Sequence, residues 1–294
     1  MIPYEPGFSR RSLLGGAAAL ALAGCGRKDK SGKPKPKPRK DGPQTAAEAV
    51  AGDWRLPADK LRDAWRHPVE SLEFWGLRPG MTVVEFWPGA GWYTDILAPF
   101  LAATGGQLYA ANLQPDDPAT AEVLAAYRRK LEDKKKLYGE VAITAFGPTS
   151  VAVAPAGTAD LALFLRNVHN WMAAGTVDKA FRDAFAALKP GGVLGVEEHR
   201  GDPGEVQDVM AADGYVQQAY VIELAKEAGF ILDKASEINA NPRDTKDHPF
   251  GVWTLPPTRL SAPRGEPARP GFDHAKYDAI GESDRMTLRF VKPT

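Results

Sequence analysis

The sequence predicts an α/β fold in which a mostly parallel sheet carries helices on both of its faces. Three observations support this prediction. From residue 82 onward, short apolar segments that favour strands alternate with longer segments whose apolar residues recur at helical spacing. A glycine-rich turn joins the first strand to the helix that follows it. About 270 residues remain once the leading segment is set aside, which suits one large α/β domain.

The first 24 residues are typical of an export signal, which is removed from the mature protein and takes no part in the fold. Arg10 and Arg11 precede an apolar segment of roughly ten residues, shorter than the roughly 20 that a membrane-spanning helix needs. This arrangement resembles a twin-arginine signal. Residues 22–25, LAGC, resemble the lipobox of bacterial lipoproteins, in which the cysteine is lipidated. Cys25 is also the only cysteine, so an intrachain disulfide is excluded.

Residues 25–45 are predicted to form a linker between the lipid and the domain. Its centre is rich in lysine and proline, cannot bury apolar surface, and favours an extended polyproline II conformation. We therefore expect a periplasm-facing protein that is anchored in a membrane of the cell envelope through lipid at Cys25. The whole chain has 37 basic and 37 acidic side chains, a balance that gives no electrostatic indication of nucleic-acid binding.

Residues 46–294 are predicted to form the folded domain. Residues 46–75 have helical spacing that is interrupted by prolines, and the alternating elements follow. The Lys-Pro-Gly-Gly turn at 189–192 and the glycine at 229 are typical helix ends. The predicted strands are 82–87, 107–113, 141–146, 159–168, 192–198, 230–238 and 285–292. The predicted helices between them are 93–101, 119–138, 177–188 and 215–228.

This order of elements resembles the class I S-adenosylmethionine-dependent methyltransferases, whose seven-stranded Rossmann-like sheet is mostly parallel. Residues 84–91, VEFWPGAG, resemble the first motif of that family, and residues 160–171 resemble the fourth. Residues 77–82 and the LKPGG turn at 188–192 resemble its other common turns. The segments WPGAGWYT and RNVHNW resemble, more narrowly, a group of exported bacterial proteins that are catalogued only as predicted methyltransferases. The resemblance covers the domain from residue 46 onward.

The first motif indicates a ligand site at the carboxyl ends of the strands. Gly89 and Gly91 would let the backbone approach a ligand without a Cβ clash, and Glu85 stands where an acid can hold the amino group of the cofactor. An aromatic face attracts a sulfonium cation, which is one interpretation of Trp87 and Tyr93; the other is packing in the core. The resemblance implies S-adenosylmethionine as cofactor, bound by residues that include Asn112 and Asn167.

Three positions depart from the methyltransferase pattern. Asn112 stands where the family usually has an acid that accepts hydrogen bonds from both ribose hydroxyls, and an amide has only one oxygen acceptor. Pro148 follows the third strand, where many members have an acid that contacts the adenine amine. Trp87 replaces the first glycine of the turn. These departures put the affinity for S-adenosylmethionine in question.

A second group of polar side chains follows the fourth and fifth strands. It contains His169, Glu198 and His199, and neighbouring strands would bring these residues together. One interpretation is a general base, because histidine titrates near neutral pH. The alternatives are a metal site of two histidines and a carboxylate and a structural polar network. His248 has no such neighbours in the pattern and is expected at the surface.

Residues 239–284 contain few apolar positions, and so long a loop is commonly a lid or a surface excursion. Residues 241–248 would be the part that covers the pocket. The leading functional hypothesis is methyl transfer from S-adenosylmethionine to a small-molecule acceptor, with His169, His199 and Glu198 as the catalytic group. The alternative is an envelope binding lipoprotein that kept the methyltransferase fold without catalysis.

Overall fold

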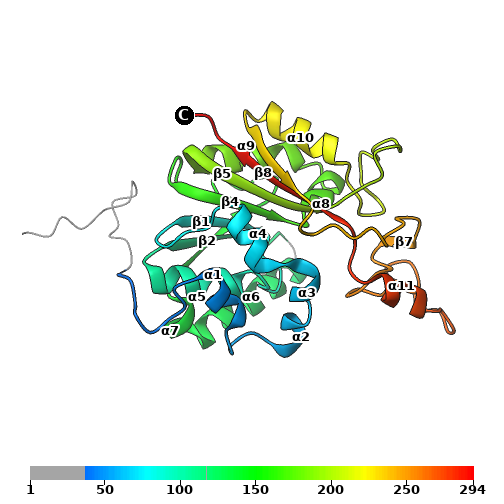
Figure 1. The fold of residues 1–294 in the computed structure, drawn as a ribbon, viewed down its shortest axis with the longest axis horizontal. Helices are drawn as coiled ribbons and strands as arrows, with labels where there is room; N and C mark the ends of the chain where they lie inside the picture. The colour runs from blue at the N-terminus through cyan, green and yellow to red at the C-terminus, as the bar shows by residue number, and fades with distance from the viewer. Residues whose placement is uncertain (1–36, 117) are drawn as a thin grey trace, which may run out of the picture.

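The computed structural model describes residues 37–116 and 118–294, and its centre is a seven-stranded sheet (Figure 1). The strand order is β3-β2-β1-β4-β5-β8-β6. The first five strands pair in parallel, and β8 runs antiparallel to both of its neighbours, β5 and β6. The strands are β1 (Thr82–Phe86), β2 (Gln107–Leu113), β3 (Val141–Phe146), β4 (Ala159–Leu165), β5 (Leu188–His199), β6 (Ile231–Ser236) and β8 (Arg285–Val291). The predicted α/β fold is confirmed.

The central strands β1 and β4 are buried, and successive side chains of each strand point to opposite faces of the sheet. Val84 and Phe86 of β1 belong to one hydrophobic core, and Val83 belongs to the other. The first core lies under α8 (Val168–Ala173), α9 (Val177–Ala187) and α10 (Gln218–Glu227). The second core lies under α1 (Ala46–Ala51), α4 (Pro68–Phe74) and α5 (Thr94–Thr104).

The remaining helices lie at the edges of these two layers. The short helices α2 (Pro57–Lys60) and α3 (Asp63–Arg66) connect α1 to α4. The predicted helix 119–138 is divided into α6 (Pro118–Asp133) and α7 (Lys135–Tyr138), because Lys134 leaves the helical region of backbone conformation. Helix α7 brings Tyr138 into the core, where the hydroxyl of Tyr138 donates a hydrogen bond of 2.6 Å to Asp95.

Strands β1 and β4 end earlier than predicted, and the residue directly after each of them has a positive φ. Trp87 has φ 44° directly after β1, and Arg166 has φ 59° directly after β4. Residues other than glycine rarely adopt this left-handed backbone conformation, and such strained residues are often found at functional sites. The positive φ at each residue ends the strand, so that Trp87 and Arg166 leave the sheet at the carboxyl ends of β1 and β4.

Residues 239–284 form an ordered excursion with its own small core. It contains β7 (Pro249–Val252) and α11 (Ala275–Ile280), and Leu255, Tyr277 and Ile280 pack together within it. Figure 1 shows this excursion at one end of the sheet.

The export signal and Cys25 lie outside the described residues. The described part of the predicted linker contacts the domain, because the backbone amide of Arg39 donates a hydrogen bond of 2.7 Å to the carbonyl of Ala103. Within the residues that the structure describes, no helix is both long and apolar enough to span a bilayer.

Candidate functional site

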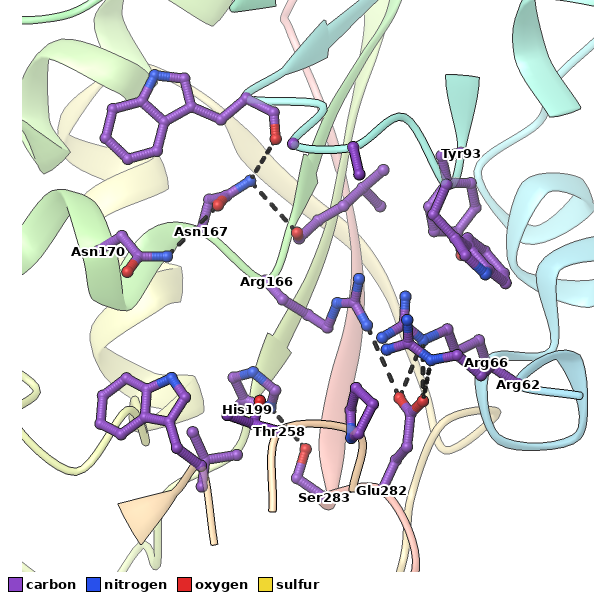
Figure 2. Close-up of a pocket in the computed structure, with 18 of the residues that line it drawn as sticks. Arg62, Arg66, Tyr93, Arg166, Asn167, Asn170, His199, Thr258, Glu282 and Ser283 are labelled. Carbon is purple, nitrogen blue, oxygen red and sulfur yellow. Dashed lines mark hydrogen bonds and ion pairs between the residues drawn. The ribbon is translucent and has the colours of Figure 1, made fainter. Parts of the chain in front are cut away.

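A cavity of about 400 Å³ lies at the carboxyl ends of β1, β4 and β5. One wall is the turn after β1, and another is formed by residues after β4 together with His199, the last residue of β5. The excursion covers it with Val252, Trp253 and residues 256–258, together with Arg264. Figure 2 shows the side chains that point into it. This is the edge of the sheet where the sequence predicted a ligand site.

Glu85 lies at the base of this cavity and is nearly inaccessible, with 2% of its surface exposed. Its carboxylate accepts a hydrogen bond of 2.7 Å from the hydroxyl of Thr94, which is itself 3.0 Å from the hydroxyl of Tyr127. Burial disfavours the charged form and raises the pKa of Glu85 to about 7, although the bond from Thr94 and the charge of Lys130 lower it. Glu85 is therefore close to half protonated at neutral pH.

Trp87 lines the cavity on the side of β2 and β3. Its indole Nε1 donates a hydrogen bond of 2.9 Å to the carbonyl of Phe146, the last residue of β3. Its ring packs at 6.1 Å from the ring of Phe146 and at 5.9 Å from that of Trp171. The Nδ2 of Asn167 donates hydrogen bonds to the carbonyls of Phe86 and Trp87, at 3.3 Å and 3.2 Å. The indole therefore closes the cavity toward the ends of β2 and β3.

Tyr93 also lines the cavity, and its hydroxyl donates a hydrogen bond of 3.3 Å to Glu197. Its ring lies 6.5 Å from that of Trp75 in the core. The core packing of Tyr93 is therefore confirmed. Tyr93 also borders the cavity, and attraction of a sulfonium by its ring stays a prediction.

His169 and Glu198 form a hydrogen-bonded pair at the cavity. His169 Nδ1 lies 2.9 Å from Glu198 Oε1, and only 5% of His169 is exposed. The carboxylate also accepts from the backbone amides of Val168 at 2.6 Å and of His199 at 2.8 Å. A carboxylate that accepts these hydrogen bonds favours the tautomer of His169 with the proton on Nδ1, which leaves Nε2 to accept a proton.

His199 lies beside this pair, with its ring 5.3 Å from that of His169. Burial lowers the pKa of His199 well below its ordinary value, and the nearby His169 and Arg166 act in the same direction. A neutral His199 hydrogen-bonds through Nδ1 with the hydroxyl of Ser283. The ligand atoms of His169, Glu198 and His199 lie within 4.8 Å of one another, so this set also has the composition of a metal site.

Four arginines that sequence reasoning did not single out surround one carboxylate next to the cavity. Arg62 and Arg66 donate to Glu282 at 2.8 Å and 2.9 Å, and Arg166 lies 3.7 Å from it (Figure 2). Arg285 donates to the same carboxylate at 2.8 Å. The only available signal was the position of Arg166 in the RNVHNW segment, next to the predicted Asn167.

Known structures share this architecture at low sequence identity. The crystal structure of the [4+2]-cyclase SpnF is 17% identical with a TM-score of 0.51, and the match covers 83% of each chain. A SAM-dependent methyltransferase from Aquifex aeolicus is 18% identical with a TM-score of 0.49, covering 66% of this chain and 93% of that one. Phosphoethanolamine N-methyltransferase 2 from Haemonchus contortus, in complex with S-adenosyl-L-methionine, is 16% identical with a TM-score of 0.49, covering 78% and 53%. No protein-family model and no curated protein sequence matches the chain.

The chain has the class I methyltransferase fold. In this fold the family is expected to hold the ribose at the end of β2 and the adenine next to the end of β3. Asn112 is fully buried at the end of β2, and its Oδ1 accepts from the amide of Leu113. Neither Asn112 nor residues 146–148 line the cavity.

Of the two glycines in the turn after β1, only Gly89 borders the cavity. Gly89 lines the cavity, and a Cβ built on it would meet no atom within 4 Å. Gly91 does not line the cavity, because Lys130 Nζ lies 3.1 Å and Tyr127 lies 3.3 Å from the place of its Cβ. The chain therefore fits the amino-acid part of S-adenosylmethionine beside Glu85, but its side chains do not fit the adenosyl part. The predicted cofactor roles of Asn112 and Gly91 stay predictions.

Two expectations outside the cavity are wrong. His248 is buried rather than at the surface, because its Nε2 bonds to Asp244 at 2.8 Å, and Asp244 also accepts from the hydroxyl of Tyr215. This network fixes residues 241–248 against β8, since Asp244 also accepts from the amide of Asp284. The part of the excursion that covers the cavity is therefore residues 252–264 instead.

Proposed function

We propose that this chain is an enzyme that removes a proton from a small molecule bound in the cavity, with His169 as the proton acceptor. The observation that carries the proposal is the 2.9 Å contact between the Nδ1 of His169, which lines the cavity, and Glu198, which is fully buried and hydrogen-bonded behind it. A structural histidine needs no such arrangement at a cavity, whereas a general base needs a fixed tautomer and a partner for the charge that it gains.

The chemistry follows from these groups alone. His169 takes a proton on Nε2 from a hydroxyl or an amine of the bound molecule, and Glu198 stabilises the imidazolium that forms. His199 remains neutral because burial lowers its pKa, so it adds no second positive charge beside His169. Glu85, with a pKa of about 7, can exchange a proton at the base of the cavity.

Methyl transfer from S-adenosylmethionine is one candidate reaction. The position of Glu85 and the open Gly89 support it. The position of Trp87 favours the second candidate, a protein that acts on or only binds its ligand without this cofactor. A fold alone does not fix a reaction, and the first of the similar structures is described as a [4+2]-cyclase.

The proposed setting is the cell envelope, with the domain anchored through lipid at Cys25 and facing the periplasm. The LAGC sequence and the paired Arg10 and Arg11 support this setting. The twin-arginine route carries folded proteins, so a loaded ligand would be exported with the chain.

The test compares His169→Gln with the wild type in a mixture of small metabolites, with and without S-adenosylmethionine, by mass spectrometry. We expect one compound to be converted by the wild type and about 10²–10⁴-fold more slowly by the variant. His274→Gln is the matched control, because His274 does not line the cavity. A chelator separates the metal interpretation, since a metal-free base keeps its activity. Conversion by His169→Gln at the wild-type rate would contradict the role of His169.

A further inference from the structure

We propose that Arg166, together with Arg62 and Arg66, binds a carboxylate or phosphate group of a small molecule in the cavity. This inference rests on the proposed function for the identity of the cavity and adds the chemical class of its occupant. The three side chains converge from two distant parts of the chain, because Arg62 and Arg66 flank and end α3 while Arg166 follows β4 (Figure 2).

The charges around Glu282 do not balance. Glu282 lies within ion-pair distance of four arginines, Arg62, Arg66, Arg166 and Arg285. In the part of the chain that the structure describes, the only other acid paired with them is Glu197, 3.3 Å from Arg285. Four positive charges therefore face two negative ones among the described residues. Buried charges are normally paired, because removing them from water is costly. The excess of two positive charges is what a site for an anion requires.

Of the four arginines, Arg166 has the longest contact with Glu282 and is the one that we expect to bind the ligand. Its contact with Glu282 is long, at 3.7 Å, and within residues 37–116 and 118–294 its buried Nε has no hydrogen-bond partner. Burial lowers the pKa of Arg166 from its ordinary value. Its φ of 59° is a strained conformation of the kind that is often found at binding sites, and the residue lines the cavity.

The surroundings favour a small ligand with one anionic group. Arg264 reaches the cavity from the covering segment and stacks on Trp253, with its guanidinium carbon 4.4 Å from the ring centre. The acids of the lining are Asp59, Glu282 and Glu85, and Glu85 is half neutral at pH 7. A guanidinium binds carboxylate and phosphate in the same forked geometry. Anchored there, the ligand shares the cavity with His169.

The experiment is a calorimetric titration of the full chain with inorganic phosphate and, separately, with succinate. We expect saturable binding of at least one of them and a roughly ten- to hundredfold loss of affinity in Arg166→Gln. Arg166→Lys keeps the charge without the fork and should lose less affinity than Arg166→Gln. Arg259→Gln is the matched control, because it removes the same charge from an exposed ion pair with Asp278 and should bind like the wild type.

Thermal melts without ligand distinguish a binding role from a structural one. A structural arginine would lower the melting temperature when replaced, whereas relief of unbalanced charge should leave the melting temperature of Arg166→Gln unchanged or higher. No binding of either probe, or equal affinity in Arg166→Gln and Arg259→Gln, would overturn the inference. Anion binding is measured without turnover, so a failure of the proposed base leaves this result standing.

Discussion

Replacing Trp87 by glycine should open the side of the cavity that faces the ends of β2 and β3. The indole is held there by its bond to the carbonyl of Phe146 and by its packing against Trp171. Glycine is the residue that the methyltransferase pattern has at this position. The φ of 44° also suits glycine better than any other residue.

The cost in stability can be worked out from these contacts. Replacing a fully buried tryptophan by a small residue costs about 3–5 kcal/mol, and Trp87 is only partly buried. Loss of one hydrogen bond costs about 1 kcal/mol, while relief of the left-handed backbone returns roughly 1–2 kcal/mol. We therefore expect the free energy of unfolding to fall by about 1–3 kcal/mol, a decrease in melting temperature of roughly 2–4 °C per kcal/mol.

The gain in the free energy of cofactor binding should be about as large as this loss of stability. In the wild type, S-adenosylhomocysteine would have to displace the indole, at a cost of about 1.5–3 kcal/mol for its buried surface. Trp87→Gly should therefore bind this ligand roughly ten- to hundredfold more tightly by calorimetry. Trp54→Ala is the control, because Trp54 bonds in the same way to the carbonyl of Asp95 but does not line the cavity. Equal affinity in folded Trp87→Gly and wild type would refute the reasoning.

Three further predictions concern charge and anchoring. Because Glu85 has a raised pKa, the native state holds its proton more tightly than the unfolded chain, and stability should fall by about 3 kcal/mol as pH rises from 4.5 to 7. Urea unfolding at pH 4.5 and at pH 7 should show a smaller decrease in the free energy of unfolding for Glu85→Gln than for the wild type. An equal decrease in the two proteins would contradict the raised pKa of Glu85. Cys25→Ser should abolish membrane association in cell fractionation, and unchanged association would exclude lipid at Cys25. Changing both Arg10 and Arg11 to lysine should stop export, and continued export would indicate the general secretory route.

The sheet could be predicted from the sequence because its information is local. The strands 107–113 and 141–146 were predicted at the observed residues, since short apolar runs between turns define them. The ends of β1 and β4 were predicted too late, because Trp87 and Arg166 adopt a positive φ that no local pattern of apolar residues reveals. The tertiary contacts of the cavity, rather than propensity, hold these two residues in place.

The site was only partly predictable for the same reason. His169 and Glu198 could be placed together because they lie at the carboxyl ends of β4 and β5, which are neighbouring strands of one sheet. Glu282 accepts hydrogen bonds from Arg66, which is 216 residues away in the sequence. No sequence spacing predicts such a contact. The position of the Trp87 indole at the end of β3 also depends on a long-range contact, its hydrogen bond to the carbonyl of Phe146.

The most direct test of the account is a crystal structure of the wild-type chain, soaked separately with S-adenosylhomocysteine and with the anion that binds most tightly. The account predicts the anion on Arg166 beside His169, and the indole of Trp87 still bonded to the carbonyl of Phe146 in both crystals. Adenosine bound at the end of β2 with Trp87 displaced, or an anion bound away from Arg166, would contradict it.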